Sequence, residues 1–251
     1  MPADQPHVEA RDLTLAYGDF VIQQNLDFSV QRGEIFIVMG SSGCGKSTLL
    51  RHLIGLKEPA KGEILYAGTS FTHASLEKRR QMLSQMGVMY QSGALWSSMT
   101  LIENVALPIT EHMNLSSVEA REIAEFKLAL VGLTGFEDFL PSKISGGMRK
   151  RVGVARAMAL DPDVLFFDEP SAGLDPPSAR LLDDLILELR DNLGITMIVV
   201  THELESIFRI ADNSIFLDQE SRTLRAVGPP ALLRDESPDG MIRGFLTRGT
   251  P

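Results

Sequence analysis

A segment in the first part of the chain has the residue types and the spacing that bind a nucleotide phosphate. It follows the pattern G-x-x-x-x-G-K-[S/T] and consists of Gly40, Ser41, Ser42, Gly43, Cys44, Gly45, Lys46, Ser47 and Thr48. The glycines allow backbone N–H groups to converge on an anion, Lys46 would neutralise the terminal phosphates, and Ser47 would offer a hydroxyl to Mg²⁺. The alternative is an ordinary glycine turn. Because an apolar run precedes the segment and a helical run follows it, the order favours a phosphate site.

Two carboxylates follow a second apolar run, residues 164–167. This run does not alternate, which is typical of a strand buried on both faces of a parallel sheet. Since ligands sit beyond the carboxyl ends of such strands, Asp168 and Glu169 are expected near the phosphates. Asp168 is the candidate ligand of Mg²⁺, and Glu169 is the candidate to orient or deprotonate the attacking water. Alternatively, Asp168 caps the turn and Glu169 is solvated.

Two further polar side chains stand where predicted strands end. His202 follows the apolar run 195–200, and Gln91 closes the run 88–90. His202 would contact a terminal phosphate, and the amide of Gln91 could ligate Mg²⁺ or hold the attacking water. Read alone, His202 is a cap or surface residue and Gln91 a loop glutamine. Both assignments therefore depend on their position beside the other strand ends.

A second glycine-rich segment lies between these runs and opens a basic helix. It contains Ser145, Gly146 and Gly147 and has no lysine of its own. Its donors would reach a phosphate from outside. This segment therefore predicts an active site that is shared between two copies of the chain.

The order of these motifs resembles that of the ATP-binding subunits of ABC transporters, and the similarity covers almost the whole chain. Residues 40–48 look like the Walker A loop, Gln91 like the Q-loop, and residues 145–147 like the signature. Ile144 and Met148 depart from the Leu and Gln that are commonest at the ends of the signature. The Ser-Gly-Gly part that would face phosphate is intact.

The same resemblance extends to the remaining site residues. Asp168 and Glu169 are similar to the Walker B pair, Asp175 to the D-loop aspartate, and His202 to the switch histidine. Tyr17 fits the aromatic residue that stacks on adenine in this family, although a tyrosine at a strand end is as readily a packing residue. The resemblance implies ATP and Mg²⁺ as cofactors. It also implies a head-to-tail homodimer that hydrolyses ATP.

A narrower resemblance is to the ATPases of the Mla or MCE type, which power phospholipid movement between the membranes of bacteria with an outer envelope. It rests on residues 91–95, 103–108, 145–148 and 238–246. It implies an integral membrane permease, accessory subunits and MCE-type substrate-binding subunits as partners. The chain would then be peripheral, on the cytoplasmic face of the inner membrane. Two alternatives stay open: an ATPase of another importer or exporter, and a cell-division-type regulator that moves no substrate.

Composition supports a subunit that works through other proteins. The net charge of −9 disfavours attraction to nucleic acid or anionic lipid, so no nucleic-acid partner is expected. No apolar run approaches the roughly 18 to 20 residues that span a bilayer, and the start of the chain lacks signal regions. The one cysteine, Cys44, excludes an internal disulfide. It is either a reactive thiol beside the phosphate or simply a small side chain.

The predicted fold is α/β: a P-loop NTPase core of the RecA-like kind, with an antiparallel β subdomain and an inserted helical subdomain of the ABC type. Strands are predicted near residues 8–17 and 21–30, ahead of the parallel sheet. We expect one ATPase domain over residues 1–251, with residues 1–91 and 163–251 as the nucleotide-binding core and residues 92–162 as the helical signature subdomain. Beyond residue 92 the strand pattern gives way to helical periodicity.

Apolar stripes run along the predicted helices, and the second one described here is expected to pack in the core. In residues 118–130 the stripe is Ile123, Phe126 and Leu130, and a later helix carries Leu181, Leu182, Leu185 and Leu189. The stripe in residues 241–246 would pack on its own core or on another chain. Trp96, the single tryptophan, would line a groove for the permease or pack inside the helical subdomain.

Overall fold

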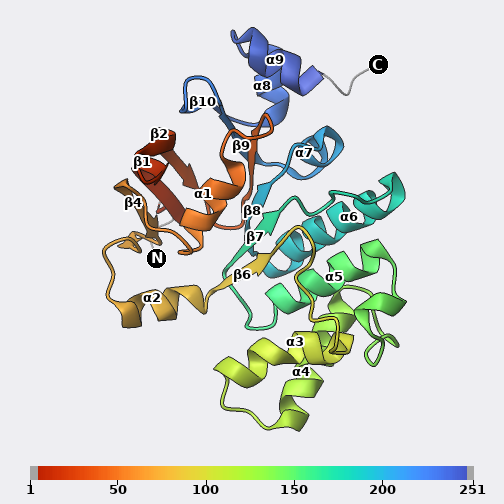
Figure 1. Ribbon diagram of the computed structural model, residues 1–251. Helices are drawn as coiled ribbons and strands as arrows, with labels where there is room; N and C mark the ends of the chain where they lie inside the picture. Colours follow the sequence, from red (N-terminus) through yellow and green to blue (C-terminus); the bar gives the residue numbers. More distant parts are fainter. Residues whose placement is uncertain (1–4, 248–251) are drawn as a thin grey trace.

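The protein contains two sheets of different kinds, a larger one in the middle of the molecule and an antiparallel one at its side (Figure 1). The computed structural model describes residues 5–247. The antiparallel sheet consists of β1 (Val8–Tyr17), β2 (Phe20–Val30), β4 (Lys61–Tyr66) and β5 (Thr69–Ser70), in the order β2-β1-β4-β5. The larger sheet consists of β3 (Ile35–Gly40), β6 (Met86–Met89), β7 (Val164–Asp168), β8 (Thr196–Val200), β9 (Asn213–Leu217) and β10 (Leu224–Val227). Its order is β10-β9-β3-β8-β7-β6, and all but β10 run parallel.

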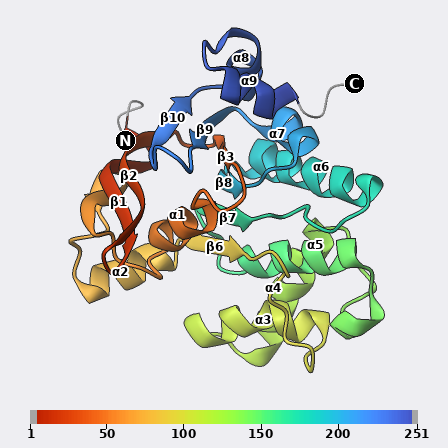
Figure 2. The same cartoon turned by 45° about the horizontal axis from the view of Figure 1, so that its top comes forward.

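Helices follow or interrupt the strands of the larger sheet (Figure 2). They are α1 (Lys46–Leu53), α2 (Leu76–Leu83), α3 (Leu101–His112), α4 (Ser117–Leu130), the short 3₁₀ helix η1 (Pro141–Lys143), α5 (Gly146–Ala157), α6 (Pro176–Leu193), α7 (Leu204–Ile210), α8 (Pro230–Glu236) and α9 (Gly240–Thr247). None of the helices between residues 5 and 247 is both long and apolar enough to cross a bilayer.

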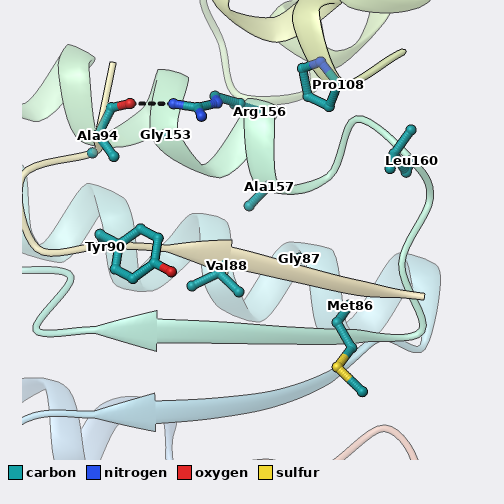
Figure 3. Close-up of a pocket in the computed structure, with 11 residues that line it drawn as sticks. Met86, Gly87, Val88, Tyr90, Ala94, Pro108, Gly153, Arg156, Ala157 and Leu160 are labelled. Carbon is teal, nitrogen blue, oxygen red and sulfur yellow. Dashed lines mark hydrogen bonds between the residues drawn. The ribbon is translucent and has the colours of Figure 1, made fainter. Parts of the chain in front are cut away.

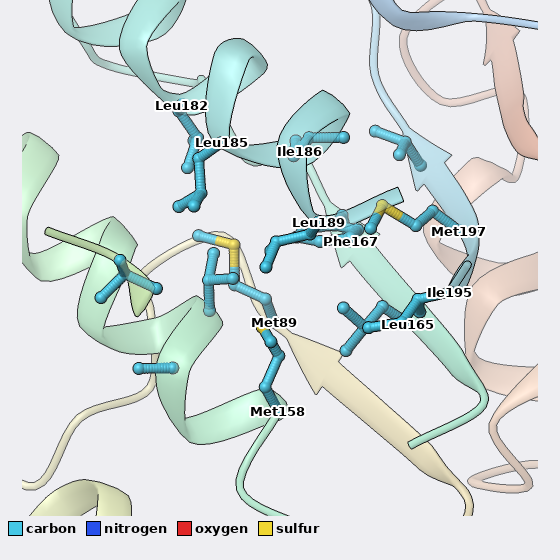
Figure 4. Close-up of a cluster of buried hydrophobic side chains, with 14 of the residues drawn as sticks. Met89, Met158, Leu165, Phe167, Leu182, Leu185, Ile186, Leu189, Ile195 and Met197 are labelled. Carbon is cyan, nitrogen blue, oxygen red and sulfur yellow. The ribbon is translucent and has the colours of Figure 1, made fainter. Parts of the chain in front are cut away.

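The larger sheet separates two hydrophobic cores because successive side chains of a strand point to opposite faces. On one face, Phe36 of β3 stacks on Phe28 of β2, with ring centroids 5.6 Å apart. The other face packs against α5 and α6, and Figure 4 shows Met89, Phe167 and Met197 of this second core. Strands covered on both faces read as unbroken apolar runs, which is why their positions could be predicted.

Residues 92–162 carry α3, α4, η1 and α5, and all of these residues are described and lie outside strands. Two helices of this block start with a capping box. In it, the side chain of the residue before the helix accepts from the backbone N–H of the third helical residue, whose own side chain accepts from the backbone N–H of the first partner. The boxes pair Thr100 with Glu103 at α3 and Ser116 with Glu119 at α4. Figures 1 and 2 both show α3 and α4 at the opposite end of the molecule from α8 and α9.

The apolar stripes coincide with the buried helix faces only in part. In α4 the buried residues include Ala120, Ala124 and Leu128, while Phe126 is 59% exposed. The buried face of α4 thus carries two small alanines, so a bulky stripe was a poor guide to it. In α6, Leu182, Leu185 and Leu189 are buried as predicted, but Leu181 is 61% exposed. One residue turns a helix by about 100°, which takes Leu181 off the buried face.

The final helix packs on the chain's own core. Ile242 and Leu246 are each 1% exposed. Phe245 meets Phe216 of β9 edge to face, with ring centroids 5.2 Å apart. The apolar stripe in this part of the sequence is therefore used within the chain.

Candidate active site

The carboxyl ends of the parallel strands open into a cavity of about 680 Å³. It lies where β3 leads into the phosphate loop, β6 leads to Gln91, β7 leads to Glu169 and β8 leads to His202. The lining residues are Ile22, Gly40, Ser41, Ser42, Gly43, Gly45, Lys46, Ser47, Thr48, Gln91, Glu169, His202, Leu204 and Phe245. The fold thus brings together four segments that are far apart in the sequence.

The phosphate loop has the backbone shape that its glycines permit. Gly40 has φ 148°, and a Cβ there would lie 2.4 Å from the carbonyl oxygen of Leu217. Gly45 has φ 104° and precedes the first turn of α1. Lys46 is 8% exposed, and its Nζ donates to the carbonyl oxygens of Gly40 at 3.0 Å and Ser41 at 3.1 Å. The loop therefore curls around its lysine at a helix N-terminus, where an anion is favoured.

Two oxygen-bearing side chains meet at the edge of this loop. The Ser47 hydroxyl donates to Oδ1 of Asp168 at 3.1 Å. Ser47 belongs to the first turn of α1 and Asp168 ends β7. This hydrogen bond joins the phosphate loop to the predicted carboxylate pair.

Glu169 adopts an unusual backbone conformation for its residue type, with φ 48°. Its N–H donates to the carbonyl oxygen of Val200 at 2.8 Å, and its own carbonyl oxygen accepts from Ala172 N at 3.2 Å and Lys150 Nζ at 3.3 Å. Non-glycine residues in this region are strained and persist where their surroundings hold them. The turn that carries Glu169 is therefore held on both sides of its Cα atom.

The Glu169 side chain points toward His202. Its Oε1 lies 2.8 Å from Nδ1 of His202, while Oε2 is buried without a hydrogen-bond partner among the described residues. The His202 side chain is 55% exposed and the Glu169 side chain 13% exposed. A buried carboxylate oxygen without a protein partner is available to a ligand or to water.

The glycine-rich signature segment lies elsewhere in the chain. Ser145 caps α5 by accepting from Met148 N at 3.2 Å. A Cβ on Gly147 would lie 3.3 Å from Cβ of Ser178 in the first turn of α6. The cavity lining, taken from the described residues, includes none of residues 145–147. The structure therefore does not bring the signature to the phosphate loop of the same chain.

Asp175 also stands outside that lining. It caps α6 by accepting from Ser178 N at 3.1 Å and from the Ser178 hydroxyl at 2.7 Å. Asp175 and the signature segment thus lie side by side at the start of α6.

Tyr17 and Cys44 also stand outside the cavity lining. The Tyr17 ring is 39% exposed, with Lys57 Nζ 3.6 Å from its centroid and Arg51 Nη1 3.4 Å from its hydroxyl. The Cys44 side chain is 1% exposed, and burial raises the pKa of its thiol. Of the two readings of Cys44, the structure favours a small buried side chain over a reactive thiol.

Sequence reasoning missed three apolar residues of the cavity and one buried lysine. Ile22 comes from β2, Leu204 from α7 and Phe245 from α9, and their local patterns gave no sign of a shared site. Lys150 follows the signature on α5 and is 7% exposed. Burial lowers its pKa, while the carboxylates of Glu169 and Asp168 act in the opposite direction. A lysine on a helix next to the signature could have been flagged for its charge.

Comparisons with known proteins agree with this geometry. A family model described as "ABC transporter" matches residues 23–172, which is more than half of the chain. The chain is 42% identical over 253 residues to "Intermembrane phospholipid transport system ATP-binding protein MlaF" of Haemophilus influenzae, covering 96% of this chain and 94% of that protein. It is 38% identical to "Probable ribonucleotide transport ATP-binding protein mkl" of Mycobacterium tuberculosis, covering 95% of this chain and 66% of that protein.

A solved structure described as the dimeric post-hydrolysis state of the ATP-binding cassette MJ0796, bound to ADP and Pi, superposes with a TM-score of 0.79. The two sequences are 26% identical, and the match covers 88% of this chain and 98% of that one. Fold, site and sequence point the same way. The chain belongs to the ABC transporter family and is one of its ATP-hydrolysing members.

Proposed function

We propose that this chain is the ATP-hydrolysing subunit of a phospholipid transport system, acting as a homodimer beneath a membrane permease. The observation that carries the substrate class is the 42% identity to the MlaF protein of Haemophilus influenzae over nearly the full length of both chains. The observation that carries the chemistry is the cavity that unites the phosphate loop with Glu169 and His202. Each half of the proposal therefore has its own support.

In this proposal the phosphates of ATP lie along residues 40–48, with Lys46 against the terminal ones. Lys46 would leave its contacts with the loop carbonyls for the phosphate oxygens. Glu169 holds or deprotonates the attacking water through its free oxygen, Oε2, while His202 steadies Oε1. Phosphoryl transfer needs mostly positioning and charge stabilisation. The arrangement supplies both.

The residues at the edge of the loop suit a bound Mg²⁺ ion. Mg²⁺ prefers oxygen ligands, and Ser47 and Asp168 already place their oxygens 3.1 Å apart. Gln91 lines the same cavity and offers an amide oxygen. When bound, the ion would neutralise charge on the β- and γ-phosphates.

Two copies would complete each other's sites. Ser145, Gly146 and Gly147 lie beside the start of α6 and away from the cavity of their own chain. In a head-to-tail dimer they would close the cavity of the partner, with Asp175 near the contact. Tyr17 would lie against the adenine. The dimeric description of the similar cassette MJ0796 supports this arrangement.

The permease would dock between the sheet and the helical block. A hollow of about 130 Å³ opens there, lined by residues that include Tyr90, Pro108, Arg156 and Leu160 (Figure 3). Trp96 is 56% exposed, so it is free to contact a partner. In this proposal the subunit lies at the cytoplasmic face of the inner membrane, together with accessory and MCE-type substrate-binding subunits.

The test is reconstitution of the subunit with its permease in membranes. ATP should drive phospholipid transfer, and the Glu169→Gln variant should assemble normally and transfer none. A complex that hydrolyses ATP at full rate without moving phospholipid would contradict the substrate class. It would leave the ATPase assignment intact.

The similarity to mkl favours a second candidate, ribonucleotide transport. Identification of the molecules that copurify with the native complex separates the two. Bound phospholipid supports the first proposal, and bound ribonucleotide at the permease supports the second.

A further inference from the structure

One face of α5 is hydrogen-bonded to the backbone of residues 91–94. Lys150, Gly153 and Arg156 are spaced three apart and so lie along one side of the helix. Lys150 Nζ donates to the carbonyl oxygen of Gln91, and Arg156 donates to that of Ala94. Figure 3 shows the second contact, with Gly153 on the same helix.

Glycines allow this contact to be close. A Cβ on Gly153 would lie 3.1 Å from the Cα of Gly93, so neither residue has room for a side chain without a shift. The helix that begins with the signature is thus packed directly on the backbone that follows Gln91. A movement of either one must be accommodated by the other.

Lys150 also reaches the turn that carries Glu169. Its Nζ is 3.3 Å from the carbonyl oxygen of Glu169, whose φ is 48°. The lysine is 7% exposed. One buried ammonium therefore holds the main chain of Gln91 and of Glu169 at the same time.

We propose that Lys150 is a positioning residue that transmits the position of the signature helix to Gln91 and Glu169. An ammonium group has three donors and no acceptor, so it can hold two carbonyl oxygens together. Both of its partners are backbone carbonyl oxygens. Lys150 therefore fixes the backbone positions from which the side chains of Gln91 and Glu169 extend. This inference rests on the proposed catalytic roles of Glu169 and Gln91.

The competing explanation is that Lys150 only stabilises the fold. The chain offers a matched control, because Lys127 of α4 is also buried, at 3% exposed, and pairs with Asp161. Replacement of either lysine by methionine removes a buried ammonium and leaves an unbranched apolar side chain that is one heavy atom shorter. The hydrogen bonds of the two lysines differ. Lys150 donates to the backbone of Gln91 and Glu169, whereas Lys127 donates to the side chain of Asp161.

The experiment compares Lys150→Met with Lys127→Met in the full chain. Lys150→Met should lower kcat about 10- to 100-fold, the loss expected when a charged hydrogen bond is removed. KM and the equilibrium affinity for ATP should stay within about threefold, because the phosphate loop is untouched. Lys127→Met should keep kcat while lowering the melting temperature. Lys150→Arg, which retains the charge and the donors, should recover part of the lost rate.

A folded Lys150→Met protein with normal kcat would overturn the inference. The inference would also be overturned if Lys150→Met and Lys127→Met had equal melting temperatures and lost kcat to the same extent. If Lys150→Met does not fold, Lys150→Gln carries the same comparison, because its amide can still donate to one of the two carbonyls. Glu169→Gln is assayed in parallel. Normal turnover by that variant defeats the proposed chemistry, whereas an inactive Glu169→Gln beside a fully active Lys150→Met defeats this inference alone.

Discussion

Glu169 combines a strained backbone with a half-satisfied side chain. One carboxylate oxygen is fixed by His202, and the other is buried without a partner among the described residues. The fixed oxygen sets the direction of the side chain, and the buried one keeps its hydrogen-bonding capacity for water or a ligand. Such a pair is suited to hold a water molecule in one orientation.

Glu169→Gln should keep ATP affinity and lose about 10²- to 10⁴-fold in kcat, because the amide keeps the shape and loses the basic oxygen. Equilibrium nucleotide binding and steady-state turnover measure the two effects. Glu203→Gln is the control, since Glu203 is also near His202 but its side chain is 51% exposed. If both variants lost turnover equally, general charge near His202 would matter more than the position of Glu169.

Cys44 should react slowly with thiol reagents in the folded protein. The thiolate is the reactive form, and burial both raises the pKa of this thiol and blocks access to it. Labelling with a maleimide at pH 7.5 should be at least about 100-fold slower than in the urea-unfolded chain. A rapid, complete reaction of the native protein would show that the sulfur reaches the surface.

At the scale of elements, a hydrogen bond of His7 connects the antiparallel sheet to the parallel one. His7 precedes β1, and its Nδ1 lies 2.6 Å from the hydroxyl of Thr196, the first residue of β8. The same hydroxyl accepts from Gly33 N at 2.9 Å. Burial and the charge of Arg32 lower the pKa of His7 from 6.5 to about 4.

This shift predicts a pH dependence of stability. Between pH 6.5 and pH 4 the unfolded chain binds the proton at this position more readily than the folded one. The contribution is therefore fully present above pH 6.5 and is lost as pH falls toward 4. We expect wild type to lose about 1 to 2 kcal/mol more than His7→Gln between pH 7.5 and 4.5, measured by urea unfolding. His73→Gln, at an exposed position, should behave like wild type; equal losses in all three would exclude His7.

The elements themselves could be predicted to differing degrees. β3, β7 and β8 are buried on both faces, so their sequences are unbroken apolar runs, and the polar residues at their ends were found from that pattern alone. The buried face of α4 could not be found in this way, because it is built from Ala120 and Ala124. Local periodicity records how apolar a face is. It does not record how close a neighbouring helix comes.

The same limit applies to the site. Gln91, Glu169 and His202 follow neighbouring strands, and their place after predicted strands was enough to group them. Phe245 lines the cavity from the last helix, and its place there depends on how α9 folds back onto β9. Lys150 contacts two backbone carbonyls across long stretches of sequence. Contacts to backbone atoms so far away in the sequence do not produce a residue pattern that can be recognised as a motif.

For the molecule as a whole, the separation of the signature from its own cavity predicts complementation between two damaged chains. A Lys46→Ala chain and a Ser145→Arg chain should each be inactive as homodimers. In the mixed dimer both lesions can fall on one interface and leave the other intact. About half of the wild-type rate per dimer should return if the two sites work independently, as measured on isolated heterodimers.

Two further measurements make this result interpretable. Melting temperatures of the separate chains show whether Ser145→Arg, which removes the cap of α5, still folds. Mixtures of Lys46→Ala chains carrying two different tags should stay inactive. A stable heterodimer with no activity would mean that each site is complete in one chain, or that the two sites are strictly coupled.

The position of Phe245 has a practical meaning for anyone who handles this protein. Because this ring borders the nucleotide cavity, an affinity tag or fluorescent reporter fused behind α9 is tethered close to bound ATP. It can crowd the cavity or pull the ring out of it. The amino-terminal end of β1 contributes no residue to the lining given by the described part of the chain, and Tyr17, proposed to lie against the adenine, is at the other end of that strand. Purification handles therefore belong at the amino terminus.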